Sequence, residues 1–137
     1  MLQQHSRQVF VFDAFESLPG YRSASSFLAV PEAAVRHNFE KFFGSVPSNV
    51  MFHKGLFKNT VPAFSKSGLQ IAVLRIDGNF YDSYQDALYY MYPLIPVGGI
   101  IIFDDIMSHP AVMKCWQDFK KEQNLEEDIK QIDDHSA

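Results

Sequence analysis

Three aspartates stand directly after two apolar runs and could bind a metal ion. Asp77 ends the run IAVLRID, and Asp104 and Asp105 end the run GGIIIFDD. If both runs are parallel strands, their carboxyl ends meet at one edge of a sheet, about 4.8 Å apart. Three carboxylates at that point repel one another unless a hard cation lies between them, and Mg²⁺ is the usual occupant of such oxygen sites. The alternative is that these acids only begin solvated loops.

The stretch between the two runs has the periodicity of a helix. In YDSYQDALYYMYPLI, apolar and aromatic residues recur every three or four positions from Tyr81 to Ile95. Ser83 and Asp86 form a weak version of a capping box. A helix that joins two strands of one sheet makes the strands parallel. Residues 71–105 are therefore predicted as strand, helix, strand.

The rest of the chain alternates in the same way. Further strands are predicted over 9–13 and 49–55, and further helices over 31–44 and 108–124. Pro31 fits a first helical position, Gly44 a helix stop and Ser108 a cap. Residues 21–29 are predicted as a surface loop, and the run from 56 to 68 as a loop or a short helix that ends near Ser67 and Gly68. This order predicts an α/β fold with a Rossmann-like, doubly wound, mostly parallel sheet.

Length and composition limit the alternatives. The 137 residues suffice for one small domain, and 47% of them are hydrophobic. A formal charge of −4 provides no basic surface for nucleic acid, and no apolar run approaches the roughly 20 residues that span a bilayer. The one cysteine, Cys115, is expected in the core and indicates a reducing compartment. We therefore expect a soluble, cytoplasmic protein without a nucleic-acid or membrane partner.

Four sequence blocks, in this order, resemble the macrocin O-methyltransferase family: VFVFDAFESLPG, GLFKNTVP, LRIDGNFYDSYQDALYYMYP and GGIIIFDD. The resemblance covers roughly residues 8 to 133. It implies a class I, S-adenosylmethionine-dependent enzyme that uses Mg²⁺ and methylates a sugar-like or diol hydroxyl of a small molecule. A homo-oligomer is compatible with this reading.

The resemblance also implies a cofactor site. Asp13, after the first predicted strand, should accept hydrogen bonds from the ribose hydroxyls of the cofactor. Gly55 and Phe57 lie in the segment that borders the adenine. A glycine permits close backbone approach, and an aromatic ring offers a stacking face. The alternative role for Asp13 is a turn or helix cap.

By the same resemblance, Asp77, Asp104 and Asp105 are the metal ligands, and Asp77 matches a proposed general base. His109, four residues beyond Asp105, is a second candidate for catalysis, although a histidine at a helix start is more often a cap or surface group. The family usually has a second aspartate where this chain has Asn79.

The resemblance further implies an incomplete domain over 1–137. The family's first strand with its glycine-rich turn, and its C-terminal hairpin, have no counterpart here. Residues 1–8 and 134–137 are expected to fray, and the acidic stretch 126–134 to be solvated. The alternative function is a catalytically inactive, methyltransferase-like fragment that serves as a binding or interaction module. A phosphoryl-transfer enzyme is disfavoured because the chain has no phosphate-binding glycine loop.

Overall fold

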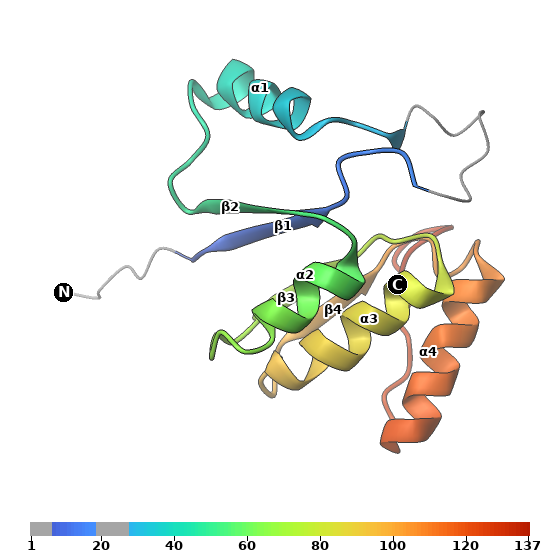
Figure 1. Cartoon of the computed structure of the whole chain (residues 1–137). Coiled ribbons are helices and arrows are strands. Elements are labelled where there is room, and N and C mark those ends of the chain that lie inside the picture. Colours follow the sequence, from blue (N-terminus) through green and yellow to red (C-terminus); the bar gives the residue numbers. More distant parts are fainter. Residues whose placement is uncertain (1–6, 19–27) are drawn as a thin grey trace. The chain divides into compact units, whose positions relative to one another are not determined.

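Two pairs of parallel strands form the sheets of this computed structural model, which describes residues 7–18 and 28–137 (Figure 1). The strands are β1 (Val9–Asp13), β2 (Val50–Lys54), β3 (Val73–Ile76) and β4 (Ile100–Phe103). β1 pairs with β2, and β3 pairs with β4. The four predicted strands are therefore confirmed, and each pair is parallel as expected.

Helices separate the strands along the chain. They are α1 (Glu32–Phe43), α2 (Phe57–Phe64), α3 (Tyr81–Met91), the 3-10 turn η2 (Tyr92–Leu94) and α4 (Pro110–Gln123). None of these helices is long and apolar enough to cross a membrane. The chain divides into two units, Met1–Thr60 with β1 and β2, and Val61–Ala137 with β3 and β4. A single domain over 1–137 stays a prediction.

In the first unit, α1 lies against one face of the strand pair. The ring of Phe39 on α1 meets Phe52 of β2 edge-on, with 6.0 Å between ring centroids, and the Arg36 guanidinium lies 4.2 Å from the Phe52 centroid. On the other face, His53 stacks on Phe12 of the neighbouring strand at 4.5 Å. His53 is therefore part of an aromatic pair.

In the second unit, α3 and α4 cover one face of the β3–β4 pair. Leu74, Ile76 and Phe103 are buried on that face. Tyr84 of α3 and Trp116 of α4 both pack on Phe103, with ring centroids 6.2 Å and 5.0 Å away. The other buried side chains of these two helices are Ala87, Leu88, Met91, Val112, Cys115 and Phe119, so the prediction that Cys115 is a core residue is confirmed.

The helix ends differ in part from the predictions. Gly44 ends α1 with φ +78°, as expected of a glycine stop. Pro31 is the N-cap rather than the first helical residue, and His109, not Ser108, is the N-cap of α4. The predicted capping box is wrong because α3 already begins at Tyr81, which places Ser83 inside its first turn. The N-cap residue, Phe80, makes no side-chain capping bond, whereas the hydroxyl of Tyr81 donates a hydrogen bond to Asp118 of α4 at 2.8 Å, so a tertiary contact accompanies this start.

The predictions for the two ends of the chain and for the loop 21–29 have different outcomes. Residues 1–6, the turn at Pro19 and Gly20, and most of the predicted loop 21–29 lie outside the described residues. The prediction that 134–137 frays is contradicted at Ser136 and Ala137, which are buried. Ala137 exchanges two backbone hydrogen bonds with Phe103, so the end of this segment is held against β4. The preceding acidic stretch is exposed for the most part, as expected.

A buried tyrosine joins the carboxyl ends of β3 and β4. Tyr84 is fully buried, and its hydroxyl lies between the carbonyl oxygens of Ile76, at 2.8 Å, and Asp104. Burial, followed by the negative charges of Asp77 and its neighbours, raises the pKa of Tyr84 well above its ordinary value. At neutral pH the hydroxyl is therefore protonated and available as a hydrogen-bond donor.

We predict that Tyr84→Phe lowers the free energy of unfolding by about 1–2 kcal/mol, because a buried hydrogen bond is lost and its acceptors remain. Urea unfolding measures this difference. Tyr90→Phe is the matched control, because Tyr90 lies on the same helix and is 41% exposed. Equal stability of the two variants would show that the Tyr84 hydroxyl does not hold the strand ends together.

Candidate functional site

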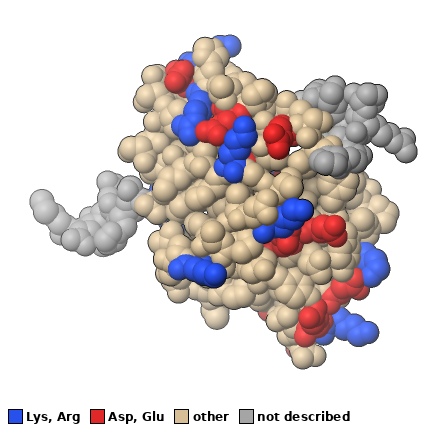
Figure 2. Space-filling view, viewed as in Figure 1, with Lys and Arg blue, Asp and Glu red and all other residues tan. Residues whose placement is uncertain are grey.

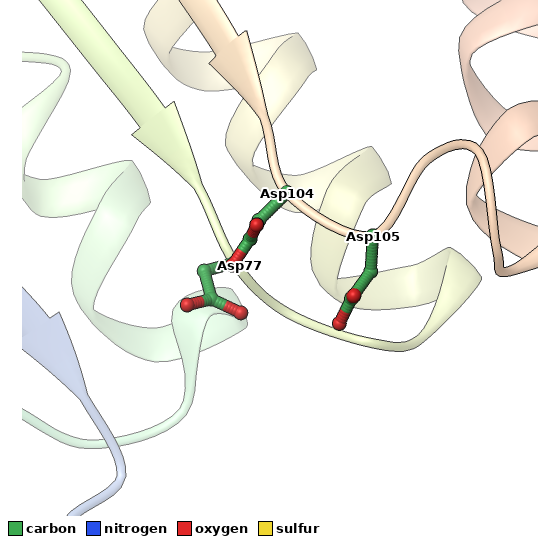
Figure 3. Close-up of side chains that lie close together, drawn as sticks. All are labelled: Asp77, Asp104 and Asp105. Atoms are coloured by element: carbon green, nitrogen blue, oxygen red, sulfur yellow. The ribbon is translucent and has the colours of Figure 1, made fainter. Parts of the chain in front are cut away.

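Three carboxylates meet at the carboxyl edge of the β3–β4 pair. Ile76 and Phe103 are paired in register, so the residues that follow them, Asp77 and Asp104, lie next to each other at the sheet edge. Asp105 is next in the chain. One oxygen from each of the three lies within 4.8 Å of the others, and Figure 3 shows the three side chains turned toward a common space. The predicted convergence is confirmed, and metal binding stays a prediction.

Arg75 partly neutralises this cluster. Its Nη2 atom lies 2.6 Å from Oδ2 of Asp104 and 3.1 Å from Oδ2 of Asp77. Arg75 and Asp77 are two residues apart along the chain, so both side chains leave the same face of the sheet. Arg75 was not among the predicted site residues, although its spacing of two residues from Asp77 indicated that the two side chains share a face.

Ser136 is a second contact that sequence reasoning missed. Its hydroxyl donates a hydrogen bond to Oδ1 of Asp104 at 2.9 Å. The two residues are 32 positions apart, and no local pattern links them. Only the return of the chain to β4 brings Ser136 to the cluster.

The two neighbouring carboxyls respond to these contacts in opposite ways. Partial burial raises the pKa of Asp77, and the hydrogen bond with Asp104 and its negative charge raise it further. Burial also acts to raise the pKa of Asp104. The hydrogen bonds with Ser136 and Asp77 and the Arg75 guanidinium outweigh burial, so the pKa of Asp104 lies below its ordinary value. Asp104 therefore holds its negative charge more firmly than Asp77.

A tight turn places Asp105 and His109. Asp105 adopts a left-handed conformation with φ +56°, which aspartate tolerates better than most residues. Its carbonyl accepts hydrogen bonds from the backbone N–H groups of Ser108 and His109. The His109 side chain makes no capping bond, and its Nδ1 lies 3.1 Å from the Ser108 hydroxyl oxygen. His109 thus follows the cluster closely in the chain, and its catalytic role stays a prediction.

The donor set fits a small hard cation. All three groups offer carboxylate oxygen, the ligand that Mg²⁺ prefers, and an octahedral Mg²⁺ with bonds of about 2.1 Å places its ligands about 3–4 Å apart. The present spread of up to 4.8 Å is only slightly wider. Asp77, Asp104 and Asp105 therefore need only small side-chain movements to share one ion.

The predicted cofactor residues lie at the carboxyl edge of the β1–β2 pair. One oxygen of Asp13 accepts a hydrogen bond from the Phe15 backbone at 2.5 Å, so the turn role considered for Asp13 is present. The Asp13 backbone carbonyl accepts a hydrogen bond from Gly55 at 2.9 Å. Phe57 opens α2 and is half-buried. The structure brings Asp13 and Gly55 together, and their binding roles stay predictions.

The backbone conformation and the limited space at Gly55 favour a residue without a side chain. Its φ is +141°, and a Cβ atom at this position would lie 3.1 Å from Cγ2 of Thr60. Both the backbone angle and the close approach disfavour a side chain. The chain therefore turns sharply at Gly55 and keeps its backbone accessible at the end of β2.

Comparison with known proteins gives the family. The sequence model described as Macrocin-O-methyltransferase (TylF) matches residues 1–137. The chain belongs to the macrocin O-methyltransferase family. Its resemblance to this family in four sequence blocks is thus confirmed.

Two curated members of the family illustrate the relationship. Demethyldecarbamoylnovobiocin O-methyltransferase of Streptomyces niveus is 34% identical over 140 residues, which cover 93% of this chain and 52% of that protein. Mycinamicin III 3''-O-methyltransferase of Micromonospora griseorubida is 32% identical over 121 residues, which cover 88% of this chain and 46% of that protein. The chain spans about half the length of these curated relatives.

Two solved structures of methyltransferases have a similar fold. The O-methyltransferase NovP matches with a TM-score of 0.83 and 28% identity over 97% of this chain and 59% of that chain. The calicheamicin methyltransferase CalS11 matches with a TM-score of 0.63 and 21% identity over 82% of this chain and 51% of that chain, which supports the fold alone. The chain therefore has an α/β fold with parallel strands that forms part of a Rossmann-like methyltransferase fold.

The raised pKa of Asp77 leads to a prediction about stability. Ionisation of Asp77 is less favourable in the folded chain than in the unfolded chain. Its contribution to stability is therefore present below the ordinary pKa of 3.8 and is lost as the pH rises through the raised value. We expect Asp77→Asn to raise the melting temperature at pH 7 in EDTA, and this gain to vanish near pH 3.

Thermal unfolding with and without MgCl₂ tests this prediction. We expect Mg²⁺ to stabilise the unsubstituted chain more than Asp77→Asn, because the variant lacks one charged ligand. Asp128→Asn is the control, because the Asp128 side chain is 97% exposed and lies outside the cluster, where it pairs with Lys120. A lower melting temperature of Asp77→Asn in EDTA at pH 7 would contradict the argument.

Proposed function

We propose that this chain is part of an S-adenosylmethionine-dependent O-methyltransferase that methylates a sugar-like or diol hydroxyl of a small molecule with the help of Mg²⁺. The observation that carries the proposal is the cluster of Asp77, Asp104 and Asp105 at the strand ends of a chain of this family. Curated relatives support it through their names, because one acts at the 3'' position of mycinamicin III and another at the 4' position of a rhamnosyl-tetracenomycin.

The reaction is a displacement. The hydroxyl oxygen of the substrate forms a bond to the methyl carbon while the carbon–sulfur bond breaks. The sulfur keeps the electron pair and leaves as the neutral thioether S-adenosylhomocysteine, and the hydroxyl proton passes to a base. The methyl group passes directly from the cofactor to the substrate. Alignment of these two molecules and electrostatic stabilisation therefore supply most of the acceleration.

Each candidate residue has a role in this scheme. Asp77, Asp104 and Asp105 hold Mg²⁺, which when bound orients vicinal hydroxyls and favours loss of a proton from one of them. Asp77 is the candidate base, with His109 as the second candidate. The acidic cluster thus binds the cation and can take up the proton that the reaction releases.

The cofactor is bound at the end of the β1–β2 pair. Asp13 accepts hydrogen bonds from the ribose hydroxyls with the oxygen that the Phe15 turn leaves available. Gly55 lets the backbone approach the adenine, and Phe57 offers an aromatic face. The cofactor contacts and the metal contacts thus come from different strand pairs of the chain.

We expect Asp104→Ala, in an active protein that carries this chain, to lower Mg²⁺-dependent methylation by about 100-fold or more, since the variant loses a direct metal ligand. Initial rates over a range of MgCl₂ concentrations measure this loss. Asp128→Ala, a change at an exposed acid outside the cluster, should retain full activity. Undiminished methylation by Asp104→Ala would exclude the proposed metal site.

We expect Asp13→Asn to weaken binding of S-adenosylhomocysteine by about tenfold or more, because the loss of a charged acceptor costs about 1.5–3 kcal/mol. An asparagine retains an oxygen for the Phe15 N–H group, so the turn is preserved while the charge is removed. Calorimetric titration with and without Mg²⁺ measures the affinity, with the exposed Glu16→Gln as control. Equal affinities of Asp13→Asn and the control would mean that Asp13 serves only the turn.

The same titration separates the enzyme from the alternative of a non-catalytic binding module. Saturable binding of S-adenosylhomocysteine by the unsubstituted chain supports the methyltransferase and justifies a screen of hydroxylated substrates. A folded chain without affinity for S-adenosylhomocysteine favours the alternative.

A further inference from the structure

The segment 132–137 is an ordered turn next to the acidic cluster. Oδ1 of Asp133 accepts hydrogen bonds from the backbone N–H groups of His135 at 2.8 Å and Ser136 at 2.7 Å. The Ser136 carbonyl in turn accepts one from the Ile132 backbone at 3.0 Å. These bonds lower the pKa of Asp133. A charged carboxylate therefore closes the turn and fixes the backbone of Ser136.

This turn is attached on both sides of the residues that carry the cluster. Ala137 exchanges two backbone hydrogen bonds with Phe103, at 2.6 and 3.0 Å, just before Asp104. The Met107 backbone N–H group donates to the carbonyl of His135 at 2.9 Å, just beyond Asp105. Three main-chain bonds thus tie the turn to residues 103–107.

From this position Ser136 fixes the Asp104 carboxylate. Its side chain is buried for the most part, and its hydroxyl donates to Oδ1 of Asp104. The other oxygen, Oδ2, faces Arg75. With a donor on each oxygen, the plane of the carboxylate has little freedom to rotate, and the ionised form is favoured.

We propose that Ser136, held by the Asp133 turn, is a positioning residue that orients Asp104 for a divalent cation. The inference rests on the metal site of the proposed function. Partners that hydrogen-bond to metal ligands typically contribute about 10–100-fold to metal affinity, because they orient the ligand and tune its charge. The segment 132–137 then contributes to the site through the Ser136 hydroxyl, which the Asp133 carboxylate holds in place.

Two variants separate orientation from packing. Ser136→Ala removes the hydroxyl and keeps the main-chain bonds, whereas Ser136→Thr retains a hydroxyl. We expect Ser136→Ala to weaken Mg²⁺ binding to the metal-free chain by about tenfold in calorimetric titration with MgCl₂, and Ser136→Thr to restore most of the affinity. Ser65→Ala is the control, because its hydroxyl donates a hydrogen bond to the Pro62 carbonyl, away from the cluster.

A disruption of the turn provides an independent test. Asp133→Ala removes the acceptor of both N–H groups and should weaken Mg²⁺ binding as Ser136→Ala does. Asp133→Asn retains an acceptor oxygen and should weaken it less. Equal affinity of Ser136→Ala and the unsubstituted chain for Mg²⁺ would overturn the proposal, as would a loss that Ser136→Thr fails to reverse.

A second readout distinguishes this proposal from the proposed function. The Asp104 carboxyl signal in carbon-13 NMR of the metal-free chain at pH 7 should change its chemical shift in Ser136→Ala, because the hydroxyl that contacts Oδ1 is removed. If the unsubstituted chain binds no Mg²⁺, the metal site fails and this inference with it, even where the NMR difference is seen. If Mg²⁺ binds and the Asp104 chemical shift is unchanged by Ser136→Ala, only the positioning role is wrong.

Discussion

The parallel pairing of β3 and β4 is the constraint on which the acidic site depends. It brings Asp77 beside Asp104 and Asp105, and the mutual repulsion of their charges must be offset within the structure. Without a cation, the guanidinium of Arg75 and the hydroxyl of Ser136 provide that compensation. The opposite pKa shifts of Asp77 and Asp104 show that compensation is uneven, since donors on Asp104 outnumber those on Asp77. Negative charge therefore remains on the cluster, and this charge would attract a cation.

Rigid apolar packing makes this arrangement precise. Phe103, at the end of β4, lies between Tyr84 and Trp116, and Tyr84 extends its hydroxyl to the backbone at both strand ends. The side chains that could do chemistry therefore project from strand ends held by a core rather than from long loops. Acidic and basic side chains are interspersed on the face drawn in Figure 2, so this face carries no broad acidic surface.

The proposed cofactor residues and the proposed metal ligands lie on different strand pairs. Asp13 and Gly55, the proposed cofactor residues, lie at the end of the β1–β2 pair, and the proposed metal ligands lie at the end of the β3–β4 pair. Each pair presents its functional residues at the carboxyl ends of parallel strands, where ligands bind in open α/β sheets. The chain spans about half the length of its curated relatives.

The sequence by itself determined the alternation of strands and helices, the glycine stop at Gly44 and the convergence of the three aspartates. These features follow from local hydrophobic periodicity and from the rule that parallel strands end at the same edge. It could not determine where α3 begins, because helix packing overrides local capping preferences. Nor could it reveal the contact of Ser136 with Asp104, since no pattern within a few residues encodes a hydrogen bond across 32 positions. Only the tertiary structure, by returning the chain to β4, decided which uncharged residue lies beside the charged ones.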